Sequence, residues 1–434
     1  MTVTVSDRER VAHVVRRLSM GVHPKLLGDL RDTDAAIAAA LDLSAATAPL
    51  LELAAPSGSS PPAVSEIAKP IAWWIQRMAV SNRLVEERLV WFWHDHFATS
   101  LAKVREPYLM WQQHVTLRAH ATGNFADLLH AVARDPAMIL YLDGITNSAR
   151  ERNENFGREC LELFTMGRDG GYTQDDVVAA AQSFTGWIVN LPNRPSSRRF
   201  NAAPWSAVFL PQRHDAGTKT LLGKTGTFDM DGALEVILDH PATARVVSTK
   251  LYRELVGRTP DDKTVDRLAK TFRKDYAIMP LVQAIVDDDA FIADDSVRAK
   301  FRTPIEKLVG ILQASGVSAV DIGRLGPRAT RPRNGTAAGQ ALRTMSFLPF
   351  LPPNVGGFPK GARLLGPHSL VHTFDLLQAV PDPVAPARGT SIDDLFAQYG
   401  IFDVSDRSHT VVARQKDNAK RVALVVTSPE YTLT

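Results

Sequence analysis

Apolar residues recur three and four positions apart along most of the chain, the spacing of a helix that buries one face. Val11, Val14, Val15 and Leu18 show it in the first helix that we expect, over residues 9–19. The same spacing runs through 33–54, 65–97, 108–134, 154–166, 174–187, 229–239, 241–256, 261–271, 278–286 and the end of the chain, where one or two closing helices are expected. The pattern predicts a mostly α protein, built as a single large multi-helical domain of 434 residues.

The helical pattern breaks over residues 188–228. Pro, Asn, Arg, Ser and aromatic residues replace it, and two short pieces, WSAVFL and KTLLG, favour strands. We therefore expect a small β-hairpin flap inserted among helices. We expect five regions in the single domain. They are N-terminal helices (1–55), core helices with the candidate site (63–187), the flap (188–228), a second helical half with a Pro-rich loop (229–380) and C-terminal helices (391–434). A loop at 56–62 and a Pro/Ala linker at 381–390 separate these regions.

Two helix starts carry a specific signal. Thr173 with Asp176, and Thr303 with Glu306, have the spacing of a capping box, in which the two side chains satisfy each other's backbone N–H groups. The turn before Asp176 also resembles half of a calcium-binding loop. Its first ligand positions fall on residues without charge, so a capped turn is favoured.

Composition and charge exclude several classes of function. The chain has 50 basic and 47 acidic residues, a balance that gives no electrostatic case for nucleic acid despite a local cluster of Arg194, Arg198 and Arg199. A single cysteine, Cys160, excludes an internal disulfide and a cysteine-based zinc cluster. No apolar run approaches the ~20 residues that span a bilayer, and the N-terminus lacks a secretion signal. We expect a cytoplasmic protein without nucleic-acid or membrane partners, and the pattern carries no signal for an oligomeric state.

The densest candidate chemistry lies between residues 143 and 187. On a helical wheel for 154–166, Asn155, Glu159 and Glu162 occupy one flank beside the apolar stripe. Two carboxylates this close repel each other and raise the pKa of one, which suits a general acid or a metal cradle. The alternative is an ion-pair ladder, because Glu154, Arg158 and Glu162 follow at i, i+4 and i+8. The flank is therefore the primary candidate site.

Histidines provide a second kind of candidate. His94 and His96 lie in the run VEERLVWFWHDHF, roughly 160° apart at about 100° per residue. One straight helix cannot aim both at one ion, so they chelate a metal only if the helix ends between them. Buried, hydrogen-bonded imidazoles are the alternative. His214, followed by Asp215, has the form of a base with an orienting carboxylate, or of a simple turn.

One more basic strip lies near the N-terminus. His13, Arg16 and Arg17 follow at i, i+3 and i+4, on a different side of the first expected helix from its apolar residues. Such a cluster favours a solvated basic face.

Short motifs stand along the chain from about residue 9 to the SPEY ending at 428–431. They are His13 with Arg16 and Arg17, WHDHF at 93–97, DPAM at 135–138, NENFGRE at 153–159, LELF at 161–164, YT at 172–173, FTGW at 184–187, HPATA at 240–244 and PPNV at 352–355. Taken together they resemble one bacterial family, catalogued as domain of unknown function 1800. Its members are often exported and often encoded beside sulfatase-like proteins, which implies work on polymeric or sulfated material outside the cytoplasm. This chain departs from the family in lacking an export leader and in having Phe358 where Trp is usual, which removes one candidate stacking ring.

Three hypotheses for function follow. The first is a hydrolase of glycosidic bonds in a carbohydrate substrate. In this hypothesis the general acid is Glu159 or Glu162, and the second carboxylate is Asp143, Asp95 or the other Glu. The rings that stack on the sugar are Trp93, Trp187 and Trp205. Further substrate-binding residues are Asn155, His214 and Asn354. The second is an enzyme that uses a divalent metal such as zinc, iron or manganese, held by His94 or His96 with Glu159, Glu162 and His214. The cofactor is thus none or a divalent metal. The third is a non-catalytic binding or assembly protein whose motifs are caps, turns and buried polar networks.

Overall fold

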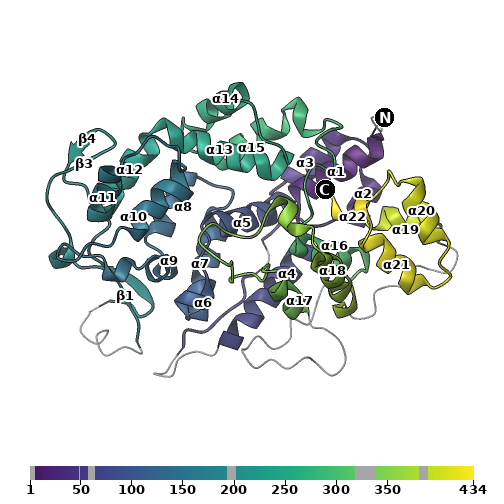
Figure 1. Ribbon diagram of the computed structural model, residues 1–434, viewed down its shortest axis with the longest axis horizontal. Coiled ribbons are helices and arrows are strands. Elements are labelled where there is room, and N and C mark those ends of the chain that lie inside the picture. The colour runs from purple at the N-terminus through teal and green to yellow at the C-terminus, as the bar shows by residue number, and fades with distance from the viewer. Residues whose placement is uncertain (1–4, 48, 57–63, 193–201, 318–337, 381–389) are drawn as a thin grey trace.

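The computed structural model describes residues 5–47, 49–56, 64–192, 202–317, 338–380 and 390–434 (Figure 1). These residues form 22 α-helices and two small antiparallel hairpins, which confirms the mostly α prediction. The arginine cluster at Arg194, Arg198 and Arg199, most of the 56–62 loop and most of the 381–390 linker lie outside the described residues. Within the described residues, no helix is both long and apolar enough to cross a bilayer.

The first half of the chain builds the centre of the molecule, around α5, and contributes α10 and α11 to one end (Figure 1). Its helices are α1 (Asp7–Leu18), α2 (Pro24–Asp29), α3 (Thr33–Leu41), α4 (Ala68–Val80), α5 (Leu84–His96), α6 (Leu101–Val104), α7 (Pro107–His120), α8 (Phe125–Ala133), α9 (Pro136–Tyr141), α10 (Asn155–Glu159) and α11 (Gln174–Ser183). A one-turn 3₁₀ helix, η2 (Gly144–Thr146), follows α9, and a π-helix, η3 (Cys160–Thr165), continues α10.

The second half adds helices around this centre and at both ends. They are α12 (Met230–Asp239), α13 (Pro241–Val256), α14 (Asp262–Phe272), α15 (Ile278–Val286), α16 (Pro304–Ala314), α17 (Ala338–Thr344), α18 (Pro367–Ala379), α19 (Ile392–Gln398), α20 (Asp406–Ala413), α21 (Asn418–Val426) and α22 (Pro429–Thr432). The chain end holds three short helices where one or two were expected, because Ser405, Asp417 and Ser428 each cap a new helix start.

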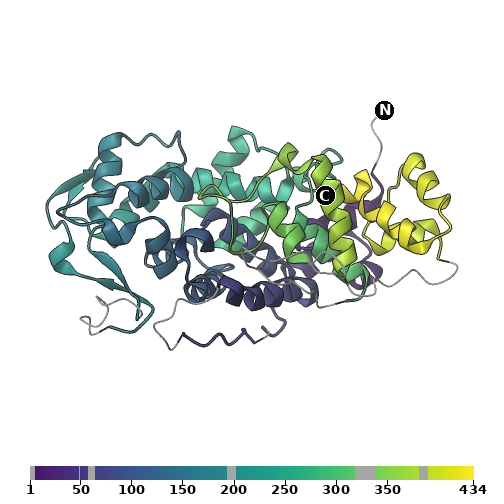
Figure 2. The same cartoon turned by 60° about the horizontal axis from the view of Figure 1, so that its bottom comes forward.

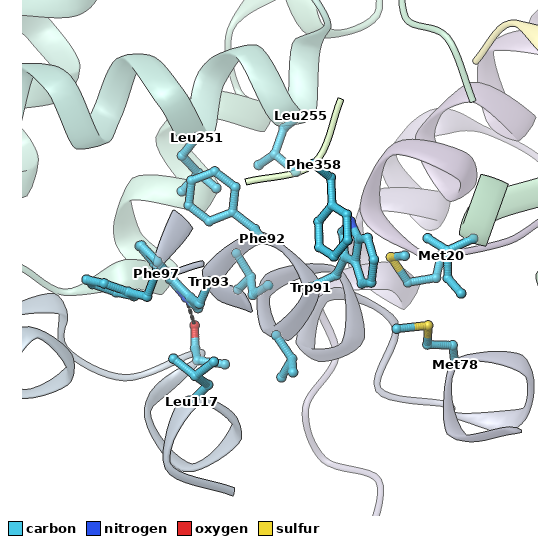
Figure 3. Close-up of a cluster of buried hydrophobic side chains, with 14 of the residues drawn as sticks. Met20, Met78, Trp91, Phe92, Trp93, Phe97, Leu117, Leu251, Leu255 and Phe358 are labelled. Atoms are coloured by element: carbon cyan, nitrogen blue, oxygen red, sulfur yellow. Dashed lines mark hydrogen bonds between the residues drawn. The ribbon is translucent and has the colours of Figure 1, made fainter. Parts of the chain in front are cut away.

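Helix α5 is the core of the molecule, because apolar side chains leave it in every direction (Figure 3). Trp91 stacks on Phe358 with ring centroids 5.0 Å apart. Phe92 points toward Leu251 on α13. Trp93 is fully buried, and its indole N–H donates a hydrogen bond of 3.0 Å to the carbonyl oxygen of Ala121. The elements that carry the candidate site are therefore anchored on a rigid, aromatic-rich helix.

The molecule is elongated, with different parts of the chain at its two ends (Figure 1). The hairpins lie with α10, α11 and α12 at one end, and α19, α20 and α21 lie at the other. Near the second end the chain returns to the first helix. The Glu9 carboxylate accepts hydrogen bonds from the backbone N–H groups of Phe402 (2.8 Å) and Asp403 (3.2 Å).

The flap prediction is confirmed, with one correction at its start. Strand β1 (Trp187–Asn190) pairs with β2 (Ser206–Phe209), and β3 (Lys219–Leu221) pairs with β4 (Lys224–Gly226). The helix expected to reach residue 187 ends at Ser183, so Trp187 lies in a strand. The chain turns at Gly186, whose φ is +98° and where a Cβ atom would come within 2.8 Å of the Phe209 ring.

The basic strip on α1 is buried, so the expectation of a solvated face was wrong. His13, Arg16 and Arg17 have exposed fractions of 0%, 3% and 1%. The Arg16 guanidinium pairs at 2.7 Å with Glu9, two turns earlier on the same helix. Distant segments supply the other partners: His13 Nε2 lies 2.8 Å from the carbonyl oxygen of Phe291, and the Arg17 guanidinium donates to that of Ser296. Spacing along one helix did not reveal these distant partners.

Candidate active site

The helix that carries the candidate residues changes type in its middle. The backbone N–H groups of Met166 and Gly167 both donate to the carbonyl oxygen of Leu161, at 2.9 and 3.1 Å. The first of these bonds spans five residues, as in a π-helix, and such segments inside helices are frequent at functional sites. A helical wheel at a constant angle per residue does not detect the change. The positions of side chains after Cys160 therefore differ from those of the wheel.

Two side chains from elsewhere in the chain hold the end of the π-helix. The Lys250 ammonium on α13 donates to the carbonyl oxygen of Leu163 at 2.5 Å. His96 Nε2 lies 3.0 Å from the carbonyl oxygen of Phe164, which requires that this nitrogen carry the proton. These bonds satisfy carbonyl groups that the helix end leaves without partners.

Glu159 is the distinctive side chain of the site. It is half-buried, and its carboxylate makes no hydrogen bond or ion pair with any residue that the structure describes. Burial raises the pKa of Glu159 above its ordinary value, and the neighbouring Glu162 raises it further, against the opposing charges of Arg168 and Arg158. Glu159 is thus placed to hold a proton that an ordinary surface glutamate loses.

Glu162 has the opposite surroundings. Its two carboxylate oxygens lie 3.9 Å from guanidinium nitrogens of Arg158 and Arg168, and it accepts a hydrogen bond from the Tyr172 hydroxyl. The neighbouring Glu154 belongs to the ion-pair ladder, since its carboxylate accepts from Arg158 at 2.9 Å. The two carboxylates of the flank therefore have unlike environments.

A second carboxylate environment lies across from the first turn of α10. Asp143 pairs with the Lys103 ammonium at 2.7 Å and lies 3.4 Å from Asn155 Nδ2, which also donates to the carbonyl oxygen of Leu142. Asp143 has a φ of +59°, an uncommon conformation for a non-glycine residue. Burial raises the pKa of Tyr141, and the charge of Glu159 raises it further, so this tyrosine lies within electrostatic range of Glu159. The polar cluster consists of Asp143, Asn155, which contacts it, and Glu159, which follows Asn155 by one turn of α10.

Close packing of α10 against α11 keeps this cluster in place. At Gly157 a Cβ atom would lie 2.8 Å from the backbone nitrogen of Ala181, so only glycine allows the approach. Asn147 strengthens the same contact by donating to the carbonyl oxygen of Ala181 at 2.8 Å. The NENFGRE motif thus supplies both the polar flank and the contact that positions it.

The WHDH residues support neighbouring segments of backbone. His94 Nε2 accepts from the backbone N–H of Phe350 at 3.1 Å, and burial lowers the pKa of His94 to about 3. The Asp95 carboxylate accepts from the backbone N–H of Phe358 at 2.7 Å and pairs with the Lys360 ammonium at 2.7 Å. Together with the bond from His96 to η3, these contacts join the Pro/Gly loop at 351–359 to the π-helix.

The sequence analysis considered His94 and His96 as metal ligands and Asp95 as a catalytic partner. The structure gives Asp95 and the Nε2 atoms of both histidines backbone partners, while His96 Nδ1 is buried without one. Burial lowers the pKa of His96 well below its ordinary value. In the part of the chain that the structure describes, no three His, Cys, Asp or Glu side chains are grouped to hold a metal ion.

The remaining candidates have other neighbours. Trp93 is a core residue with no face open to a substrate, and Trp205 is buried with its ring edge-to-face on Tyr108. Trp187 is half-buried beside Phe209. Asn354 is exposed, and its side chain accepts from the backbone N–H of Gly356 at 2.8 Å.

His214 does not have the orienting partner that the sequence offered. Its Nδ1 lies 3.1 Å from the Thr185 hydroxyl. The Asp215 carboxylate instead accepts from the backbone N–H of Gly217 at 3.0 Å and lies 3.9 Å from the Lys219 ammonium. His214 and Asp215 thus form a turn, the simpler of the two interpretations.

Sequence reasoning missed Lys103, Tyr141, Tyr172 and Lys250. None stands in a conspicuous motif of charged residues, and each reaches the site from a separate element. Comparison with known proteins gives family membership alone: no curated protein and no solved structure matches the chain. The family model described as "Protein of unknown function (DUF1800)" matches residues 13–433. The motifs at His13, WHDHF and NENFGRE lie within that match, and the chain belongs to this family.

Proposed function

We propose that the chain is a hydrolase that cleaves glycosidic bonds in a carbohydrate by acid/base catalysis, with Glu159 as the general acid. One observation supports this above the others. Glu159 is half-buried and has no hydrogen bond or ion pair among the described residues, while the adjacent Glu162 lies 3.9 Å from two arginines and accepts a hydrogen bond from a tyrosine. Neighbouring carboxyl groups whose environments separate their pKa values are typical of such acid/base sites.

The role of a general acid explains why the surroundings of Glu159 lack a cation in direct contact. A glycosidic oxygen needs a proton as its bond to the sugar breaks, and the donor must hold that proton near neutral pH. A salt bridge to Glu159 would lower its pKa and remove the proton. Burial and the Glu162 charge have the opposite effect.

Asp143 is the second carboxylate of the proposal. Its carboxylate pairs with the Lys103 ammonium at 2.7 Å, and its side chain is 39% exposed, so that water reaches it. An anionic carboxylate in this position activates water or attacks the sugar carbon directly, the two roles that distinguish inverting from retaining hydrolases. Lys103, Tyr141, Asn155 and Tyr172 supply donors and acceptors for sugar hydroxyl groups around the pair.

The test is hydrolysis of a panel of polysaccharides and aryl glycosides, followed by the release of reducing ends. Glu159→Gln keeps the shape of the side chain and removes the proton donor. We expect it to lower the rate about 10²–10⁴-fold, the usual contribution of general acid–base catalysis. Asp143→Asn should show a comparable loss.

Glu151→Gln is the matched control, because Glu151 is exposed and its side chain takes no part in the cluster. It should retain full activity. Hydrolysis that survives in Glu159→Gln and Asp143→Asn, or a panel on which the purified chain has no activity at all, would contradict the proposal.

A further inference from the structure

The backbone of the π-helix η3 lacks the hydrogen bond that an α-helix would make at Leu163. In an α-helix the carbonyl oxygen of Leu163 would accept from the backbone N–H of Gly167, four residues later. Here the Gly167 N–H donates at 3.1 Å to the carbonyl oxygen of Leu161, which also accepts from the N–H of Met166 at 2.9 Å. The carbonyl oxygen of Leu163 is therefore left for a partner outside the helix.

Side chains supply bonds that fit the π-helical register. The segment lies at the end of the molecule opposite the C-terminal helices, which are yellow in Figure 2. Helix α13 packs against it, and the Lys250 ammonium on α13 donates to the carbonyl oxygen of Leu163 at 2.5 Å. The Thr165 hydroxyl donates at 2.6 Å to the carbonyl oxygen of Cys160, five residues earlier, whereas a threonine in an α-helix bonds three or four residues back.

Lys250 is a charged donor in a partly buried position. Burial lowers its pKa to about 8, and the charge of Lys360 lowers it as well, while Asp95 opposes both. The side chain is therefore still an ammonium at neutral pH. A charged donor makes a stronger hydrogen bond than a neutral one, so the bond to Leu163 competes well with the backbone N–H group of Gly167.

The helical register decides which side chains meet Glu162. Its contacts with Arg168 and Tyr172 come from residues that follow the π-helical turn. A change from five-residue to four-residue hydrogen bonds moves every residue after the turn relative to Glu159, which lies before it. The register therefore sets how the charge of Glu162 is held beside Glu159.

We propose that Lys250 is a positioning residue of the candidate site. Its bond to the Leu163 carbonyl selects the π-helical register, and this register sets the interaction between Glu162 and Glu159. The catalytic consequence rests on the proposed function. The structural and electrostatic consequences need no substrate.

A structural test compares three variants on α13. Lys250→Met removes the donor, Lys250→Arg keeps a charged donor, and Arg253→Met removes an exposed cation from the same helix. In crystal structures we expect the Gly167 N–H to bond to Leu163 in Lys250→Met and to Leu161 in the other two variants. A bond from Gly167 to Leu161 that persists in Lys250→Met overturns the proposal. Lys250→Gln, which is polar but shorter than lysine, provides the same comparison if Lys250→Met does not fold.

An electrostatic test uses the pKa of Glu159, followed by ¹³C NMR. Glu162→Gln should lower this pKa in the unmodified chain, because the charge of Glu162 raises it. In Lys250→Met the same substitution should lower it by less than about half that amount, since coupling between two groups is lost when they separate. Lys250→Arg and Arg253→Met should retain the full effect. A full effect in Lys250→Met overturns the proposal, because a variant that merely destabilised the fold would leave the coupling intact.

The same variants separate this inference from the proposed function. A chain that hydrolyses no glycoside, but whose register and Glu159–Glu162 coupling depend on Lys250, supports the positioning role and overturns the proposed function. A loss of hydrolysis in Lys250→Met with register and coupling unchanged overturns the positioning role.

Discussion

Burial away from water shifts the pKa values of individual side chains of this protein in opposite directions. It raises the pKa of Glu159 and Asp135, because a carboxyl group becomes charged when it loses its proton and burial disfavours the charged form. It lowers the pKa of Lys250 to about 8 and that of His94 to about 3, because these groups are uncharged when deprotonated. Neighbouring charges then add to the effect of burial or oppose it, as Glu162 and the two arginines do at Glu159.

The charge of Glu162 should be visible in the pH dependence of catalysis. A general acid works only while protonated, so activity falls as pH rises through the pKa of Glu159. Glu162→Gln removes the negative charge that raises this pKa and leaves Arg158 and Arg168 to lower it. We expect the falling limb of kcat/KM to move to lower pH. Glu154→Gln, which alters only the ladder, should leave the limb in place.

A titration of Glu159 followed by ¹³C NMR checks the same shift without a substrate. If the pKa of Glu159 is the same in Glu162→Gln as in the unmodified chain, the coupling between the two carboxyl groups is refuted.

Asp135 gives a prediction for stability. It caps α9 through the backbone N–H of Met138 at 3.0 Å and accepts from Gln113, yet burial raises its pKa from 3.8 to about 7. A raised carboxyl pKa means that the folded state binds a proton more tightly than the unfolded state. The proton on Asp135 therefore stabilises the folded state fully below pH ~4, and this stabilisation is lost as the pH rises to about 7.

Asp135→Asn keeps an acceptor for both donors and removes the titration. We expect the variant to be more stable than the unmodified chain at pH 8 by on the order of a few kcal/mol, with a smaller difference at pH 5. Urea unfolding at the two pH values measures this. Asp127→Asn, at an exposed position of α8, should have no such pH dependence. A constant difference between the two pH values would show that Asp135 does not titrate in this range.

At the scale of elements, capped helix starts could be predicted, whereas the π-helix could not. The capping boxes of Thr173 with Asp176 and of Thr303 with Glu306 are both present, because a cap depends on residues three apart. The end of the π-helix is bonded by Lys250 and His96, which lie 87 and 68 residues away from the carbonyl groups that they contact. Sequence spacing identified Glu159 and Glu162 as neighbours on one helix, whereas the contacts of Glu162 with Arg168 and Tyr172 lie beyond that helix.

Asp95 makes two contacts with the loop at 351–359 and the residue after it, a backbone hydrogen bond and a charge pair, and two variants separate their contributions. Asp95→Asn keeps an acceptor for the N–H of Phe358 and loses the charge pair with Lys360, whose side chain is 70% exposed. Exposed pairs contribute roughly 0–1 kcal/mol, so this variant should be nearly as stable as the unmodified chain. Asp95→Ala also leaves the N–H group without a partner and should lose about 1–3 kcal/mol.

Hydrogen exchange should report the difference at residues 356–360, with faster exchange in Asp95→Ala alone. Equal losses in the two variants would mean that the charge pair, and not the backbone bond, holds the loop.

At the scale of the whole molecule, buried charges join helices that are far apart in sequence. Arg88 on α5 pairs with Glu306 on α16 at 2.7 Å and with Glu254 on α13 at 3.1 Å, and it donates to carbonyl oxygens of Arg16 and Ser19. The helix content and flap followed from sequence periodicity. This junction did not, because a charged residue on an amphipathic helix normally marks its solvent side.

Arg88 should therefore be among the residues least tolerant of change. Arg88→Met retains much of the volume but leaves two buried carboxylates short of a partner, and we expect a loss of about 3–5 kcal/mol. Arg273→Met removes an exposed pair with Asp239 and should cost less than about 1 kcal/mol. Urea unfolding of both variants provides the comparison. Similar small losses would show that Lys300, 2.5 Å from Glu254, compensates for Arg88.

The contact between Glu9 and the backbone of Phe402 has a consequence for how the protein is made. These residues are 393 positions apart. A ribosome that adds about 5–20 residues per second needs about 20–80 s to synthesise the stretch between them. Throughout that interval the buried carboxylate of Glu9 lacks the two backbone N–H groups that it accepts from in the folded protein. The nascent chain therefore completes the surroundings of this charge only late in synthesis, and its yield in a cell should depend on chaperones that bind early.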